Sequence, residues 1–441
     1  MIFNIKRKFL KDQHVLELLR GSFVSFIFKI VGISFGYIFT LLVARWYGAE
    51  SLGLYALSLT ILNIFVTLGV FGFDNALVKF VAEYNSQEKP YLVKEIYVKV
   101  MYIVIPLGTL LSIILYLTAT FFAQEVFKKD QLTLFLQITA FGLLPFILLR
   151  VNAALFRGLK NIKLFAFFEN LGVMFFSFAG LVILELLFCN LNSSAVITIQ
   201  IVSIVILMML SFGIVKKYTN ILVTTSKHIL QFRKILKVSL PMLLTSSMTL
   251  VMGWTDIVML GMFRSEAEVG IYSVVVKLAG LTSITLIAIN SIAAPKFSEF
   301  YSKGDMEGLK KTAQDSTKMI FFTSMPIILT LIFLPKQILG MFGNEFLGGY
   351  VALWILMTGQ IVNSMVGSVG YILIMTGNER VYQNMIIFSS IINIILNYLL
   401  VKDYAIEGVA FSTAFSMGLL NIMSFIYIYK RYNFSTIKFI K

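Results

Sequence analysis

Long apolar stretches recur along the whole chain, and they limit its possible folds more than any other feature. Each exceeds the roughly 18 residues that a helix needs to cross a hydrocarbon layer about 30 Å thick. The chain is 58% hydrophobic and only 13% charged, whereas soluble domains carry about 25% charged residues. We therefore predict an all-α polytopic membrane protein with about twelve transmembrane helices, near residues 23–43, 52–72, 100–122, 132–155, 164–188, 195–215, 238–262, 269–294, 319–341, 350–376, 382–401 and 405–429.

The net charge of +15 follows the expected topology. With the N-terminus inside, most Lys and Arg residues fall in inner segments, which is the pattern that marks the cytoplasmic side. This distribution predicts that both termini are cytoplasmic, and it indicates attraction to anionic membrane lipids rather than to nucleic acid. The basic residues expected elsewhere are few, with Arg45, Lys128, Lys129, Arg264, Lys336 and Lys402 in outer loops and Lys29 and Lys277 within spans.

The second half of the chain resembles the first. Gly53 and Tyr55 follow a polar break between two spans, and Gly270 and Tyr272 occupy the equivalent places 217 residues later. We interpret this as two copies of a six-helix unit. Because each copy has an even number of spans, both insert with the same orientation, and their pseudo-twofold axis runs along the membrane normal. The predicted organisation is an N-terminal lobe at 1–218, a cytoplasmic linker at 219–236 and a C-terminal lobe at 237–441.

Motifs for soluble catalysis are absent from the sequence. There is no GxxxxGK[ST] loop, HExxH, CxxC or GxSxG. His14 and His228 are far apart and have no metal-ligand spacing, and the single Cys189 excludes an intramolecular disulfide. We predict a protein that is not an enzyme and has no metal or other cofactor. The absence of a nucleotide site leaves an ion gradient, the membrane potential or the substrate's own gradient as the driving force.

Two lysines lie inside apolar spans, where a charge costs about 2.5–3.5 kcal/mol and by default faces water or a partner. Lys29 lies in the first span and Lys277 in the eighth. Their long stems also permit snorkelling to the membrane surface. We predict that both line a hydrated cavity between the halves and bind substrate.

Four further ionisable residues are candidates for a transport role. Asp256 lies within the seventh span, where it is a candidate for pairing with Lys277, for binding a coupling cation (Na⁺ or H⁺), or for facing the outer water. Asp74 is a second candidate for ion coupling or for lining the cavity. Arg45 and Arg157 lie at span ends, where gating or headgroup contact competes with a purely structural role.

Several of these segments together bring a known family to mind. Residues 44–55 (ARWYGAESLGLY) resemble the ARxLGxxxxGxY signature that follows the first helix of polysaccharide-biosynthesis flippases (Wzx-like), with Trp46-Tyr47 where Leu is usual. These flippases belong to the multidrug/oligosaccharidyl-lipid/polysaccharide exporter superfamily. The resemblance covers roughly residues 15–430, and it is also seen in residues 72–80, 156–158, 255–256, 269–272 and 294–297.

The resemblance implies two six-helix lobes around a central cavity, working by alternating access. It implies that the substrate is an undecaprenyl-pyrophosphate-linked oligosaccharide, moved from the inner to the outer leaflet of a bacterial cytoplasmic membrane for O-antigen, capsule or exopolysaccharide synthesis. Expected partners are a polysaccharide polymerase and glycosyltransferases. Related lipid II flippases carry cavity cations on the first, second and eighth helices, and Lys29 and Lys277 match the first and eighth.

Two other functions are compatible with the sequence. One is a cation-coupled multidrug exporter of the same fold. Such exporters tend to bury carboxylates within their lobes, whereas the sequence indicates lysines as the deepest charges. The other is a non-transporting component of a glycan assembly complex, which reconstituted flipping activity would exclude.

Overall fold

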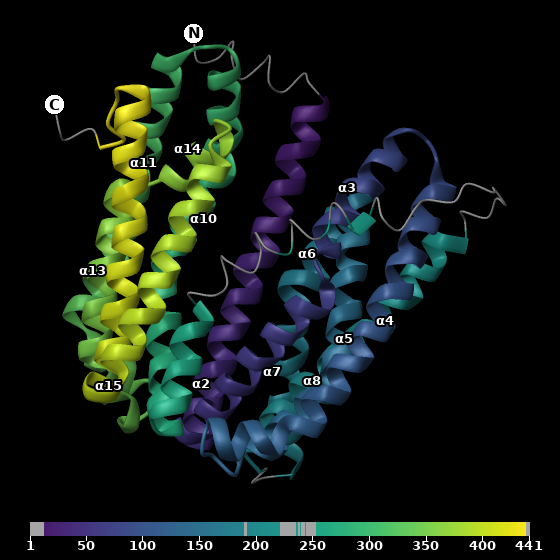
Figure 1. Ribbon diagram of the computed structural model, residues 1–441, viewed down its shortest axis with the longest axis vertical. Coiled ribbons are helices and arrows are strands. Elements are labelled where there is room, and N and C mark those ends of the chain that lie inside the picture. The colour runs from purple at the N-terminus through teal and green to yellow at the C-terminus, as the bar shows by residue number, and fades with distance from the viewer. Residues whose placement is uncertain are drawn as a thin grey trace. The chain divides into compact units, whose positions relative to one another are not determined.

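The chain is helical throughout the residues that the computed structural model describes, which are 13–188, 192–220, 235–236, 239, 243 and 253–437. Nine helices in this part of the chain are long and apolar enough to cross a membrane, and a shorter apolar helix covers Gly253–Phe263. Figure 1 shows the labelled elements. They are α2 (Gln13–Val70), α3 (Phe73–Ser86), α4 (Pro90–Phe121), η1 (Phe122–Val126), α5 (Leu132–Gly158), α6 (Ile162–Ala166), η2 (Phe167–Leu171), α7 (Gly172–Phe188), α8 (Ser194–Asn220), α10 (Glu266–Ser302), α11 (Met306–Phe333), α12 (Pro335–Gly340), η3 (Asn344–Gly349), α13 (Tyr350–Val366), α14 (Val369–Met375) and α15 (Glu379–Tyr432).

Two of these helices each contain two predicted spans. Helix α2 has a non-helical residue at Gly48 (φ 78°, ψ 179°), between the predicted first and second spans. Helix α15 has one at Ala405 (φ 47°, ψ −129°), where we predicted the eleventh span to end and the twelfth to begin. With these two breaks, the helices account for the predicted spans, although most of the seventh span lies outside the described residues.

Two predicted spans in the second half differ in their ends. The tenth was expected to continue to residue 376, but α13 ends at Val366, and Gly367 has a positive φ of 74° that an L-residue rarely adopts. The ninth was expected to reach residue 341, but α11 ends at Phe333. Pro335 begins the separate helix α12 there, because a proline ring is tolerated in the first turn of a helix and disrupts its interior.

The chain divides into two compact units, and residues 41–60 group with the later part of the sequence. The first unit is Met1–Thr40 with Ile61–Ser246, and the second is Leu41–Thr60 with Ser247–Lys441. Nearly all of the predicted linker 219–236 lies outside the described residues, so the predicted boundary between the lobes stays a prediction.

The first unit is built around α5, which packs against α3, α4 and α8. Helices α4, α5 and α8 run side by side in Figure 1. Asn152 of α5 is fully buried and joins these three helices. Its Oδ1 accepts a hydrogen bond from Tyr97 Oη at 2.7 Å, and its Nδ2 donates to Ser211 Oγ at 2.8 Å. Buried polar groups in a membrane protein need such partners because lipid supplies none.

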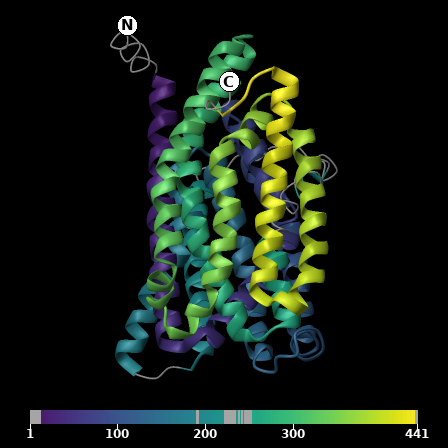
Figure 2. The same cartoon turned by 90° about the vertical axis from the view of Figure 1, so that its left-hand side faces the viewer.

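The second unit contains α10 to α15, with α13 packed on α15 and α11, and α10 packed on α11 and α13. Its apolar core at one end includes Phe297, Leu309, Ile372 and Ile428, all of them fully buried. The two arms of α15, before and after Ala405, lie side by side in Figure 2. These helices hold the most deeply buried charged group that the structure describes.

Candidate functional site

Asp256 is the most buried charged side chain among the described residues, with 3% of its surface exposed. It lies on the short apolar helix Gly253–Phe263 of the second unit. The next most buried is Lys129, at 6%. The prediction that lysines are the deepest charges was therefore wrong. Sequence position shows how far a residue lies along a span, but only packing shows which face of the span is covered.

Three neutral donors from two other helices surround the Asp256 carboxylate. Tyr272 Oη of α10 donates to Oδ2 at 2.7 Å, and Thr413 Oγ1 of α15 donates to the same oxygen at 2.5 Å. Asn397 Nδ2, from the other arm of α15, donates to Oδ1 at 2.8 Å. Lys277 is not among the partners of Asp256, and no other described Lys or Arg lies within ion-pair distance of it.

The polar cluster extends one turn further along α15. Asn393 is fully buried, its Oδ1 accepts from Asn397 Nδ2 at 3.2 Å, and its Nδ2 donates to Thr413 Oγ1 at 3.4 Å. Asn397 Oδ1 is buried and has no hydrogen-bond partner among the described residues. The cluster thus brings carboxylate, amide and hydroxyl oxygens together within a dry helical core.

An isolated carboxylate in such surroundings is costly unless it is neutralised. A bound proton and a small cation are the two ways to neutralise it when no basic side chain is near. The oxygens of Asp256, Asn393, Asn397 and Thr413 are of the kind that hard cations prefer. No group of three or more His, Cys, Asp or Glu side chains occurs in the described part of the chain, so the site is unsuited to a transition metal.

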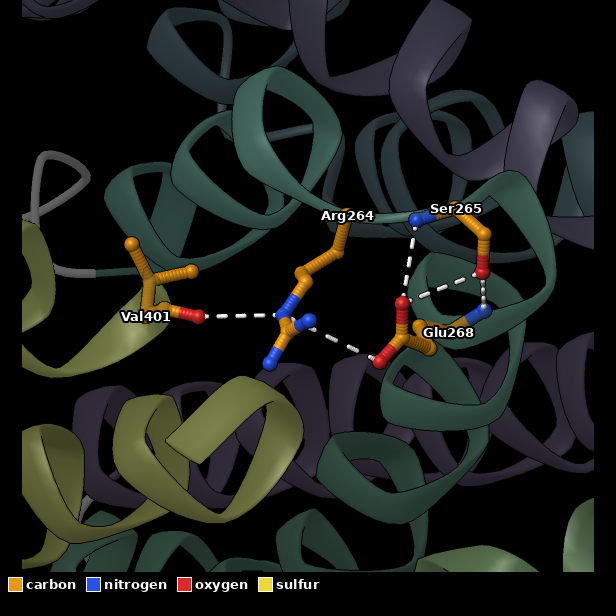
Figure 3. A network of polar contacts seen from close by, with 4 residues as sticks. All are labelled: Arg264, Ser265, Glu268 and Val401. Carbon is orange, nitrogen blue, oxygen red and sulfur yellow. Dashed lines mark hydrogen bonds and ion pairs between the residues drawn. The ribbon is translucent and has the colours of Figure 1, made fainter. Parts of the chain in front are cut away.

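The start of α10 is fixed by a capping network that Figure 3 shows. Ser265 is the N-cap residue: its Oγ accepts from the backbone N–H of Glu268 at 3.3 Å, and Glu268 Oε2 accepts from Ser265 N at 3.0 Å. Arg264 Nε donates to the Val401 carbonyl of α15 at 3.1 Å and lies 3.9 Å from Glu268 Oε1. This network joins α10 to α15 one turn before Tyr272, and so it helps to set the position of the Tyr272 hydroxyl against Asp256.

The two predicted substrate-binding lysines lie on long helices. Lys277 is on α10 of the second unit, five residues after Tyr272, and is half-buried. Lys29 is on α2 in the first unit, is also half-buried, and makes no hydrogen bond or ion pair with any described residue. Their roles stay predictions, because each belongs to a different unit.

Arg45 holds a helix end in the second unit. Its Nε donates to the Met341 carbonyl at 2.5 Å, and its Nη2 lies 3.5 Å from the Gly340 carbonyl, beside the C-terminus of α12. A cation at this end of a helix satisfies terminal carbonyls and is favoured by the helix dipole. Nearby, Glu345 Oε2 accepts from the backbone N–H of Ala49 at 2.8 Å.

The repeated glycines meet in the same unit. A Cβ added to Gly53 would lie 1.8 Å from the Glu266 carbonyl oxygen, and one added to Gly270 would lie 1.9 Å from the Ala49 carbonyl oxygen. The two contacts are reciprocal, and they relate residues that are 217 apart in the sequence. The repeated motif therefore forms a close helix crossing at which both copies require glycine.

The other two candidates make short-range contacts in the first unit. Asp74 lies in the first turn of α3, and its Oδ1 accepts from the backbone N–H of Asn75 at 2.8 Å. Arg157, in the last turn of α5, has its guanidinium carbon 5.2 Å from the centre of the Phe165 ring. Both arrangements position helix ends, and any transport role for these residues stays a prediction.

Sequence reasoning missed two groups of polar residues. Arg150 lies within α5, is half-buried, and has its guanidinium carbon 5.3 Å from the Phe146 ring centre. Its position inside the predicted fourth span was the signal that would have found it. Tyr272 and Thr413 were not predicted to contact Asp256. No local sequence signal identifies them, because they reach it from 16 and 157 residues away.

Comparison with known families identifies the chain. The family model for polysaccharide biosynthesis proteins matches residues 18–301. The chain belongs to the polysaccharide biosynthesis protein family. A second family model, MatE, matches residues 241–399 of this family member.

Curated relatives of this polysaccharide biosynthesis family member match nearly its whole length. It is 22% identical over 412 residues to the probable low-salt glycan biosynthesis flippase Agl15 of Haloferax volcanii, covering 92% of this chain and 83% of that one. It is 21% identical over 406 residues to an uncharacterised membrane protein of Methanocaldococcus jannaschii, covering 86% of this chain and 77% of that one.

Solved structures share the fold of this family member. The lipid II flippase MurJ in an inward closed conformation matches with a TM-score of 0.74 at 16% identity, covering 93% of this chain and 87% of that one. An inward-facing multidrug resistance MATE family transporter matches with a TM-score of 0.71 at 15% identity, covering 93% and 98%. These likenesses confirm the predicted twelve-helix, two-lobe membrane fold.

Proposed function

We propose that this protein is a flippase that moves a lipid-linked glycan across a membrane. The observation that carries the proposal is the match to a glycan biosynthesis flippase over 92% of the chain, within a family of polysaccharide biosynthesis proteins. A flippase moves its substrate without changing it chemically. The fold-level likeness to MurJ agrees with this proposal but does not specify the substrate.

The intramembrane lysines support an anionic headgroup. A pyrophosphate carrying sugars does not cross hydrocarbon unaided, so its carrier must offer a polar, positively charged path while the lipid tail remains in the bilayer. Lys29 and Lys277 are half-buried within long apolar helices, where an uncompensated charge is costly. We assign both to contact with the pyrophosphate or with an acidic sugar.

We further propose the details that the family resemblance implies. The substrate is an undecaprenyl-pyrophosphate-linked oligosaccharide, moved from the inner to the outer leaflet of a bacterial cytoplasmic membrane by alternating access. Both termini are cytoplasmic. The product supplies O-antigen, capsule or exopolysaccharide synthesis, and a polysaccharide polymerase and glycosyltransferases are the partners.

Asp256 supports coupling of transport to Na⁺ or H⁺. Its carboxylate is buried among neutral donors and has no basic partner among the described residues. A site whose charge is neutralised only by a cation binds that cation more tightly in one conformation than in another whenever the surrounding helices move. This difference in affinity is what couples an ion gradient to a transport cycle.

The same observation supports a second function, cation-coupled multidrug export on the same fold. Buried carboxylates within a lobe were the feature expected of such exporters, and Asp256 provides one. Its full set of hydrogen bonds within α10 and α15 favours a role in ion binding over direct contact with a cationic drug. Susceptibility to cationic dyes in cells with and without the protein separates the two functions.

The test is flipping of a lipid-linked oligosaccharide in proteoliposomes, measured by its accessibility to an added glycosidase. We expect Lys29→Ala and Lys277→Ala each to reduce the rate at least tenfold, because each removes a headgroup contact in a medium of low dielectric constant. The control is Lys310→Ala, which removes an exposed lysine from the start of α11. If both variants flip the substrate at the rate of the control, the assigned role of the lysines is wrong. If the unmodified protein flips none, the flippase proposal itself fails.

A further inference from the structure

Buried polar residues line the seam between the two arms of α15. Ser389, Asn393 and Asn397 follow one another at intervals of four residues on the first arm, and each is 0% exposed. This spacing places them on one face of the helix, about 6 Å apart along its axis. The stripe ends at Asp256, to which Asn397 Nδ2 donates a hydrogen bond.

The two arms are antiparallel, and three contacts fix their register. Asn393 contacts Thr413 near the Ala405 break, Met385 Sδ lies 3.7 Å from Ser424 Oγ further along, and Asn378 Nδ2 donates to Tyr432 Oη at 2.8 Å at the open end. In this register, Ser389 lies between the Asp256 cluster and the end of the arms that carries Glu379 and Tyr432. The polar residues thus continue from the cluster toward that end.

The hydroxyl groups on the two arms differ in their hydrogen bonding. On the second arm, Ser412, Ser416 and Ser424 each donate to a carbonyl oxygen four residues earlier in their own helix, the usual arrangement in apolar helices. On the first arm, Ser389 Oγ and Ser390 Oγ are buried and have no partner among the described residues. An unsatisfied buried hydroxyl is unfavourable, so these two oxygens indicate a ligand that occupies the seam at some stage.

We infer that the seam between the arms of α15 is the route by which a small monovalent cation, Na⁺, reaches Asp256, with the Ser389 and Ser390 hydroxyl oxygens as ligands on the way. This inference rests on the cation site assigned to Asp256 above. Amide and hydroxyl oxygens replace the water molecules that the ion loses, as hard cations require. The residues of the seam carry no charge of their own, so the ion is held weakly there and most strongly at the carboxylate.

The chain contains a reporter for this site. Trp254 lies two residues before Asp256 on the same helix, and the only other tryptophans are Trp46 and Trp354. In the full-length protein carrying Trp46→Phe and Trp354→Phe, tryptophan emission therefore reports on the surroundings of Asp256. Rapid mixing of this protein with NaCl, against choline chloride as the control salt, gives both the rate and the affinity of Na⁺ binding.

We expect the Ser389→Ala, Ser390→Ala double variant to bind Na⁺ about tenfold more slowly at an unchanged affinity. Tenfold corresponds to roughly 1.4 kcal/mol on the barrier to entry. A residue on the route changes the rates of entry and exit equally, whereas a residue that merely supports the site changes its affinity. The matched control is Ser416→Ala, which removes a hydroxyl from the opposite arm that already bonds its own helix, and it should bind at the original rate.

The Asp256→Asn variant distinguishes failure of the route from failure of the site. If Asp256→Asn abolishes the Na⁺ signal but the double serine variant binds as fast as the control, the route is wrong and the site stands. A change in affinity without a change in entry rate also overturns the route. If the unmodified protein gives no Na⁺ signal, or Asp256→Asn leaves it intact, the cation site fails and the inference fails with it.

Discussion

Replacing Gly53 with alanine tests the close crossing of the repeated motifs. The added Cβ would lie 1.8 Å from the Glu266 carbonyl oxygen, 2.7 Å from its carbonyl carbon and 3.0 Å from the Gly270 nitrogen. Ordinary contacts of a Cβ begin at 3.4 Å. The Glu266 carbonyl must therefore move away by about 1.6 Å, and because it is backbone, the start of α10 must move with it.

The size of the effect follows from two opposing terms. Overpacking that shifts backbone costs about 1–3 kcal/mol, whereas alanine in place of glycine within a helix contributes up to about 1 kcal/mol. The net expectation for Gly53→Ala is a loss of about 1–2 kcal/mol in the free energy of unfolding. In a unit of about 200 residues, each kcal/mol lowers the melting temperature by about 2–4 °C.

The matched control is Gly280→Ala. Gly280 lies on α10 like Gly270, and an added Cβ there meets nothing within 4 Å. Only the helix term applies, so its melting temperature should be unchanged or slightly raised. Thermal unfolding of the purified protein in detergent, followed by the loss of the monodisperse peak in size-exclusion chromatography, measures both variants.

The reciprocity of the crossing adds a second requirement. Gly270→Ala should cost about as much as Gly53→Ala, because its Cβ meets the Ala49 carbonyl oxygen at 1.9 Å. Once one alanine has separated the helices, the second costs less, so the double variant should lose less than the sum of the two single losses. If Gly53→Ala melts at the temperature of Gly280→Ala, or the losses add fully, the crossing described here is wrong.

The remaining predictions concern buried and capping polar groups. Asn152→Ala leaves the Tyr97 hydroxyl buried without its acceptor and should lower the free energy of unfolding by about 1–3 kcal/mol, as measured by the melting temperature, whereas alanine at the exposed Asn192 should have no measurable effect. Ser265→Ala removes the N-cap of α10 and should cost about 0.5–2 kcal/mol in the same assay. Ser302→Ala, at the other end of that helix, is its control, and equal melting temperatures for the two serine variants would contradict the capping role.

Much of the architecture was predictable because hydrophobicity is read one segment at a time. Each span must be apolar over its own length to cross a bilayer, so the spans could be located without knowing their neighbours. Local signals also predicted some of the breaks, because the polar residues around Gly48 interrupt an apolar run. The repeat of Gly53 and Gly270 was likewise readable, because both copies keep the same residue types at the same spacing.

The break at Gly367 was missed for the opposite reason. The chain around it is apolar on both sides, so hydropathy alone extends the tenth span through it. What requires glycine there is a positive φ of 74° and a close approach in which an added Cβ would lie within 2.3 Å of Thr317 Oγ1. Thr317 is on α11, 50 residues earlier in the chain, so this constraint exists only after folding.

The sequence by itself determined that the chain is a membrane-spanning helical protein, where its helices lie, and that Asp256, Lys29 and Lys277 are charged groups in apolar surroundings. Tertiary structure alone decided what those groups contact. The partners of Asp256 come from positions 16, 141 and 157 residues away, and their side chains resemble many other polar groups on apolar helices. The physical reason is that the membrane selects residues by the hydrophobicity of a segment, whereas a binding site depends on which helix faces meet.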